Sequence, residues 1–122
     1  ELSHLDEIPL RKVANYKYVD RLHCEFRKEV NELFSEEHID LDVVFQSQRE
    51  DWIQSMVQDG VGISCIPQYS LISTEIEFRP VVSPGLTRLV EFAVRAQSET
   101  PPALDKLMNF AAQHCWSSLD SR

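Results

Sequence analysis

The segment DRLHCEFRKEV, at positions 20–30, holds the side chains best suited to chemistry. Cys24 follows His23, and Arg27 stands a short distance further along. Cationic neighbours favour the thiolate form of a cysteine and so make it a better nucleophile. Glu25 acts in the opposite direction, because an adjacent negative charge disfavours the thiolate. A reactive thiol is therefore one of two interpretations of this segment.

The second interpretation is a turn that binds a ligand through its backbone. The segment joins a β-prone run to an amphipathic helix predicted over 22–37. Apolar residues at helical spacing form one stripe of that helix: Leu22, Phe26, Val30, Leu33 and Phe34. Free N–H groups and a partial positive charge at a helix start make an anion site. The simpler alternative is that His23 and Cys24 only fill the helix start.

The elements around this turn alternate between strand and helix. Three strands are predicted, and we expect them to form a parallel core with helices on its faces: 16–20, 41–47 and 62–66. Ser47 and Glu50 have the spacing of a capping box that opens a helix. Trp52 and Met56 share a face of that helix, so we expect both in the core.

The segment DGVGISCIPQYSL, at 59–71, specifies a series of turns. Gly60 suits the left-handed position that ends a helix, and Gly62 permits a close backbone approach. Pro67 suits the first position of a short helix.

The remaining elements are shorter or lie near the C-terminus. They are a helical turn after Pro9, a strand at 75–82 interrupted by Pro80, a strand at 88–96 and a helix from about Pro101 to His114. One apolar stripe is expected on the last helix: Leu104, Leu107, Met108, Ala111 and Cys115.

Composition narrows the class of protein. The length of 122 residues fits one α/β domain or part of a larger one. A net charge of −8 repels nucleic acid, so DNA binding by these residues is not expected. Three widely spaced cysteines and no leader-like or membrane-spanning run indicate a cytoplasmic protein. The chain begins at Glu1 without methionine, so we expect it to be a segment of a longer protein.

Motifs for catalysis and metal binding are missing from the sequence. The four histidines are scattered, without ligand spacing, so no metal and no cofactor are expected. No GxSxG elbow is present, and the capping-box spacing explains Ser47 more simply than a nucleophile would. The glycine pair at 60 and 62 follows a helix rather than a strand, unlike a nucleotide-binding fingerprint. We therefore expect no catalytic residue and no enzyme activity.

The order of these elements and motifs resembles the effector-binding domain of LysR-type transcriptional regulators. A helix that ends in G-x-G-[IV]-x-x-[LI]-P recurs in that family. This chain matches it at Gly60, Gly62, Ile63, Ile66 and Pro67. The family also has a closing strand that runs into a helix whose start is rich in serine and proline. Residues 98–102 of this chain resemble that helix start. The resemblance covers nearly the whole chain.

The resemblance implies an α/β fold, a Rossmann-like subdomain of the type 2 periplasmic-binding-protein fold. Residues 1–96 would form the second effector-binding subdomain, and 97–122 a C-terminal helix that returns to the first subdomain. A small effector would bind between the subdomains. DNA would be bound only through an N-terminal winged helix-turn-helix outside this chain. A solute-binding module of the same architecture is the alternative, because a fold does not determine a function.

The resemblance also implies where the effector would be contacted. In the family the matching turn meets effectors that are often carboxylates or other small anions. The implied contact residues come from this turn and from the later 66–68 turn: Leu22, His23, Cys24, Glu25, Ile66, Pro67 and Gln68. Peroxide-sensing members carry a reactive cysteine in a His-Cys context at the same turn. Their second cysteine corresponds to the position of Leu33 or Phe34, so we expect no disulfide switch here.

Assembly is the last expectation from the resemblance. Family members pair through their effector domains, and the helix at 22–37 would offer Arg27, Glu29 and Asn31 to a partner. The final helix would leave four apolar residues short of burial: Leu104, Leu107, Met108 and Trp116. We therefore expect the chain to form homo-oligomers.

Overall fold

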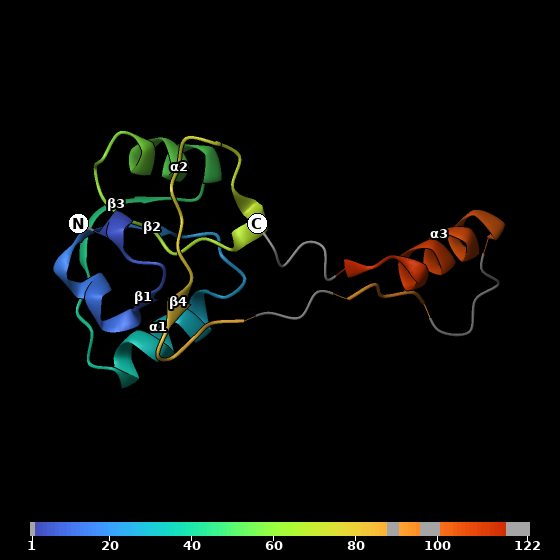
Figure 1. Cartoon of the computed structure of the whole chain (residues 1–122), viewed down its shortest axis with the longest axis horizontal. Coiled ribbons are helices and arrows are strands. Elements are labelled where there is room, and N and C mark those ends of the chain that lie inside the picture. The colour runs from blue at the N-terminus through green and yellow to red at the C-terminus, as the bar shows by residue number, and fades with distance from the viewer. Residues whose placement is uncertain (1, 88–90, 96–100, 117–122) are drawn as a thin grey trace. The chain divides into compact units, whose positions relative to one another are not determined.

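A computed structural model of the chain describes residues 2–87, 91–95 and 101–116. The chain forms two compact units, Glu1–Thr87 and Arg88–Arg122. Every strand found in the described residues belongs to the first unit, which also contains two of the α-helices (Figure 1). Among the described residues, no helix is long and apolar enough to cross a membrane.

The main sheet pairs β2 (Lys17–Arg21) with β3 (Asp42–Ser47) in parallel. On the other edge of β2, Val19 N–H donates to Ile63 O at 2.8 Å and Ile63 N–H donates to Lys17 O at 2.9 Å. These bonds make a parallel bridge between Tyr18 and Ile63. The expected parallel arrangement is thus confirmed for two strands, whereas the third predicted strand contributes one bridge at Ile63 rather than pairing over 62–66.

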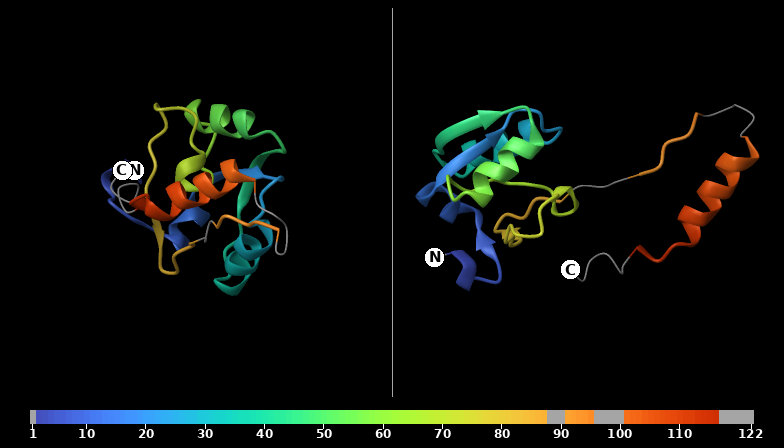
Figure 2. Two further views of the ribbon diagram at one scale, coloured as in Figure 1. Left: turned by 90° about the vertical axis from the view of Figure 1, so that its right-hand side faces the viewer. Right: turned by 90° about the horizontal axis from the view of Figure 1, so that it is seen from above.

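Helices α1 (Arg27–Glu36) and α2 (Glu50–Gln58) lie on opposite faces of this sheet, as expected (Figure 1). The left view of Figure 2 shows the same layering, with α2 at the top and α1 at the bottom. Successive side chains of a strand point to opposite faces, so the side chains of β2 point alternately toward α1 and α2. Tyr18 faces α1, where its ring meets Phe34 edge to face at 6.1 Å between centroids.

The larger core lies on the α1 side of the sheet. Its buried members are Leu10, Val13, Tyr18, Phe34 and Ile39. Six partly buried residues pack against them: Val30, Leu33, Leu41, Ile63, Cys65 and Val81. Val19 and Ile53 are also fully buried but lie outside that cluster. Leu10 and Val13 belong to a 3-10 helix, η2 (Leu10–Asn15), which confirms the helical turn expected after Pro9.

The start of α1 differs from the prediction of a helix over 22–37. The helix begins at Arg27, and Leu22 lies in a bend that follows β2. Leu22 N–H donates to Ser47 O at 2.9 Å and so continues the hydrogen-bond ladder between the strands. A tertiary contact therefore outweighs the helical spacing of Leu22.

The predicted capping box at the start of α2 is wrong. Ser47 is the last residue of β3, and its Oγ accepts the N–H of Arg49 at 3.0 Å. Glu50 instead directs its carboxylate to Arg21. The core position expected for Trp52 is also wrong, since this side chain is 50% exposed and the Arg49 guanidinium lies 4.9 Å from its ring centroid.

The strand predicted at 75–82 is reduced to β4 (Val81–Val82), which pairs in parallel with β1 (Ile8–Pro9). Ile8 N–H donates to Pro80 O at 2.9 Å, and Arg79 Nε donates to Leu5 O at 2.9 Å. Pro80 has no N–H to give to a ladder, which limits the pairing to the two residues after it.

The second unit contains α3 (Pro102–Gln113), close to the predicted helix. Of the strand predicted at 88–96, residues 91–95 make no sheet pairing, and the other positions lie outside the described residues. The first unit also contains the 3-10 helices η1 (Leu2–His4) and η3 (Gln68–Ser70).

The two glycines after α2 adopt the roles expected from the sequence. Gly60 has a φ of +74°, and the N–H of Val61 donates back to Met56 O at 3.0 Å, which closes the end of the helix. Gly62 lies so close to β2 that a Cβ would collide with the Lys17 carbonyl oxygen and lie 2.9 Å from its carbon.

We expect Gly62→Ala to destabilise the chain by about 1–3 kcal/mol, because the added methyl must displace backbone rather than a flexible side chain. Gly85→Ala is the matched control, since a Cβ there makes only an ordinary contact with Val81 O at 3.6 Å and the residue has no left-handed φ. Urea unfolding measures both. A loss for Gly62→Ala no greater than that for Gly85→Ala would show that β2 can yield at this position.

Candidate functional site

The turn that joins β2 to α1 spans residues 22–26. Leu22, His23 and Glu25 are exposed, whereas Cys24 is partly buried. The N–H of Arg27 donates to Cys24 O at 3.0 Å, which closes the turn immediately before the helix. The Cys24 side chain therefore points toward the protein interior, whereas those of His23 and Glu25 face outward.

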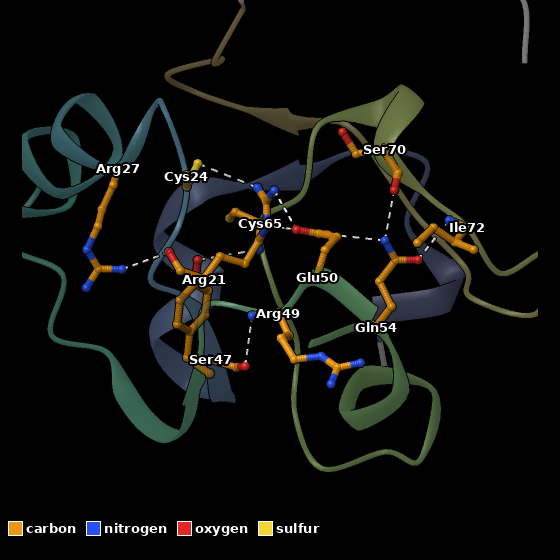
Figure 3. Close-up of polar contacts among 11 residues, drawn as sticks. Arg21, Cys24, Arg27, Ser47, Arg49, Glu50, Gln54, Cys65, Ser70 and Ile72 are labelled. Atoms are coloured by element: carbon orange, nitrogen blue, oxygen red, sulfur yellow. Dashed lines mark hydrogen bonds and ion pairs between the residues drawn. The ribbon is translucent and has the colours of Figure 1, made fainter. Parts of the chain in front are cut away.

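Arg21 lies at the end of β2 and points to the α2 face. Its side chain is only 10% exposed, and its Nε and Nη2 reach Glu50 Oε2 at 2.8 and 2.7 Å. Its remaining nitrogen, Nη1, donates to Cys24 Sγ at 3.5 Å (Figure 3). The cation beside the cysteine is thus already paired with a carboxylate.

Asp20, one position earlier, points to the α1 face and holds Arg27 there. Arg27 donates from Nη1 to Asp20 Oδ1 and from Nη2 to Oδ2, both at 2.8 Å, and also from Nη1 to Arg21 O at 2.9 Å. Gln46 Nε2 donates to Asp20 Oδ2 at 3.0 Å. The hydrogen bonds to Asp20 raise the pKa of the Arg27 guanidinium above its ordinary value. Arg27 therefore anchors the start of α1 to the sheet.

A small cavity of about 20 Å³ lies beside the turn. It is lined by Tyr18, Asp20, Arg21, Cys24, Arg27, Val30, Asn31, Phe34, Leu41 and Cys65. This volume holds about one water molecule. Burial raises the pKa of the Cys65 thiol, and burial likewise raises that of Tyr18, whose Oη accepts the Cys65 N–H at 3.4 Å.

The seven predicted contact residues fall in two segments that the structure brings to one edge of the sheet. The 22–25 turn follows β2, and residues 66–68 follow the stretch that bridges β2 at Ile63. Because the bridge is parallel, both segments leave at the carboxyl end of the strands. Cys24 is the one predicted residue that lines the cavity. Ile66 and Pro67 are partly buried, and Gln68 is exposed.

Sequence reasoning missed the residues that connect the 22–25 turn to residues 70–72, just beyond the second segment. Besides Arg21 and Glu50, the structure adds Gln54, which is 3% exposed. Its Nε2 donates to Glu50 Oε1 at 3.2 Å and to Ser70 O at 2.8 Å, and its Oε1 accepts Ile72 N–H at 2.8 Å. The sequence has no local signal for this role, because Ser70 and Ile72 lie 16 and 18 residues away.

No group of three or more potential ligands among the described histidines, cysteines and acids could hold a metal ion. The site offers paired charges, one half-buried thiol and exposed turn residues. Such a surface can bind a small molecule.

The family model for the LysR substrate binding domain matches residues 1–116. A search among curated proteins found no match. The family model agrees with the mixed α/β architecture and its parallel pairing. The chain therefore belongs to the LysR substrate-binding domain family, whose members have a periplasmic-binding-protein-like fold and act as regulatory, effector-sensing domains of transcriptional regulators.

Proposed function

We propose that residues 1–96 form the second, Rossmann-like subdomain of this effector-binding fold, and that 97–122 return to the first subdomain. The parallel β2–β3 pair, with a helix on each face, supports this assignment. A small, anionic metabolite binds in the cleft between the subdomains. The 22–25 turn and the 66–68 segment form the wall that this chain contributes.

One observation carries the proposal: both segments leave the same edge of the sheet, and buried polar side chains link the 22–25 turn to residues 70–72, which follow the second segment. The cavity behind them has a volume of only about 20 Å³, too small for a metabolite. An effector therefore binds on the outer side of this edge rather than in this cavity.

Helix α1 supports a preference for anions. Its first turn follows the 22–26 turn directly and carries Arg27, Lys28 and Glu29. The N–H groups of a helix start favour negative ligands. Arg21 and Arg27 are each paired with a carboxylate, so the backbone contributes more of this preference than the two guanidinium groups do.

Small carboxylates should stabilise the full-length regulator more than their neutral amides do. A carboxylate at about 100 times its Kd adds roughly 2.7 kcal/mol, which raises the melting temperature by roughly 5–10 °C. Differential scanning fluorimetry with matched pairs, such as benzoate and benzamide, measures this. Equal shifts from acid and amide would contradict an anionic effector.

Substitutions in the wall locate the ligand. His23→Ala and Gln68→Ala should reduce the carboxylate shift, because both exposed side chains stand on the proposed wall. Lys12→Ala, on the exposed side of η2, is the control and should keep the shift. Identical shifts in all three variants would place the ligand elsewhere.

The wider role follows from the same proposal. The parent protein is a cytoplasmic regulator that binds DNA through an N-terminal winged helix-turn-helix, and this chain supplies the sensor. The net charge of −8 suits a domain that does not itself contact DNA.

A redox sensor is the second candidate, and one observation favours it. Cys65 lines the same cavity as Cys24. Two thiols and one hydrogen peroxide would give a disulfide and two waters, with the first thiol passing through a sulfenic acid. The pKa of Cys65 is raised by burial, which makes its thiolate scarce. Effector binding therefore remains the preferred function.

Cys24→Ser should leave the carboxylate-induced stabilisation largely intact, because serine keeps the size and polarity of the side chain. Peroxide treatment followed by non-reducing peptide mapping tests the second candidate. A disulfide mapped between Cys24 and Cys65, together with a peroxide response that Cys24→Ser abolishes, would reverse the order of the two functions.

Self-association of the chain is proposed from the second unit. On α3, Leu107 is 51% exposed and Phe110 is 70% exposed, and Trp116 beyond it is 51% exposed. Leu104 and Met108 are only partly buried. Exposed apolar surface of this kind drives association between copies. Exchange of the C-terminal segment is the other route to a dimer.

Sedimentation velocity at micromolar concentration should therefore show a dimer that dissociates on dilution. Leu107→Glu should shift the equilibrium to monomer, whereas Asn109→Glu, on the same helix, should not, because it adds the charge at a polar position. A single monomeric species, unchanged on dilution, would show that these residues need no partner.

A further inference from the structure

Gln54 is a buried polar residue in a helix whose other buried residue is Ile53. All of its hydrogen-bonding groups face partners of the correct kind. Its amide nitrogen meets the carboxylate of Glu50 and the carbonyl of Ser70, and its oxygen meets the N–H of Ile72. Gln54 thus fastens the 70–72 segment to α2.

The same chain of contacts continues to the 22–25 turn. Glu50 accepts from Gln54 through Oε1 and from Arg21 through Oε2, and Arg21 then donates to Cys24 Sγ. Figure 3 shows this path from Cys24 to Ile72 as one series of dashed contacts. Three side chains on two elements therefore connect two segments that are far apart in the sequence.

Two members of this path are buried, and the carboxylate between them is partly exposed. Arg21 and Gln54 are 9% and 3% exposed, so neither can exchange its partner freely for water, whereas the Glu50 side chain is 31% exposed. A buried polar group that loses its partner is costly, and linked hydrogen bonds strengthen one another. Breaking a contact of Arg21 or Gln54 therefore carries a free-energy cost that the rest of the path must absorb.

We propose that Arg21, Glu50 and Gln54 are positioning residues that couple the 22–25 turn to the 70–72 segment. On the proposed function, these residues make one responsive surface of the effector wall, so that a ligand at the turn changes how firmly α2 holds residues 70–72. The coupling itself is a property of this unit and needs no effector to be observed.

Alkylation of Cys24 by iodoacetamide, followed peptide by peptide in the 122-residue chain, tests the coupling. Gln54→Leu removes the far end of the path without touching Cys24. We expect it to accelerate Cys24 alkylation at least about fivefold, at the low end of measured couplings between sites. Gln58→Leu is the matched control. It lies one turn later and also binds a following segment, through Glu75 at 2.6 Å and Ser73 at 3.2 Å, but is outside the path.

Two results would overturn the proposal. One is equal Cys24 rates in Gln54→Leu and Gln58→Leu. The other is the same acceleration in Val13→Ala, a core variant outside the path, at a matched loss of stability, because general loosening would then explain it. If Gln54→Leu does not fold, Gln54→Glu replaces it, since it keeps an acceptor for Ile72 N–H and loses both donated bonds. No effector enters this experiment, so its failure can be distinguished from a failure of the carboxylate-binding test.

Discussion

The buried charge of Arg21 is the constraint on which this edge of the sheet depends. Alternation along β2 directs Tyr18 to the α1 core and Arg21 to the opposite face, where little water reaches it. A guanidinium buried without a partner would cost several kcal/mol. Glu50 meets that requirement, and the start of α2 is thereby fixed over β2 by charge as well as by Ile53. The turn at 47–49 then takes the shape that brings Glu50 into reach.

The carboxylates near Cys24 change the role of the two arginines beside it. The sequence places arginines near this thiol, which suggests an activated cysteine. In the structure Arg21 is bound to Glu50 and Arg27 to Asp20, so each cation near the turn is accompanied by a carboxylate. The arrangement is better suited to holding the turn in one geometry than to lowering the cost of a thiolate. Rigid placement of a turn is what a sensing surface requires.

Local patterns predicted the parts of the fold that depend on neighbours in sequence. Helical spacing located α2 and α3, and the two glycines after α2 have the expected backbone roles. The late start of α1 could not be predicted, because Leu22 follows a bond to Ser47 rather than its own periodicity. For the same reason Gln54 was missed, since its partner Ile72 lies 18 residues away and leaves no local pattern. Among the candidate contacts, the closeness of Cys24 to Cys65 depends on the strand register at Ile63, which the sequence alone does not define.

The short β1–β4 pair has a mechanical consequence. Because Ile8–Pro9 and Val81–Val82 run in parallel, the chain enters the first unit at one end of this pair and leaves it at the other. Tension applied through both flanking segments would therefore load the bonds between the strands together, in shear, instead of opening them one by one like a zipper. Arg79, which grips Leu5 O beside the pair, adds a further point of resistance. Force transmitted along the chain would therefore reach the β2–β3 sheet only after all the bonds of the β1–β4 pair had broken together.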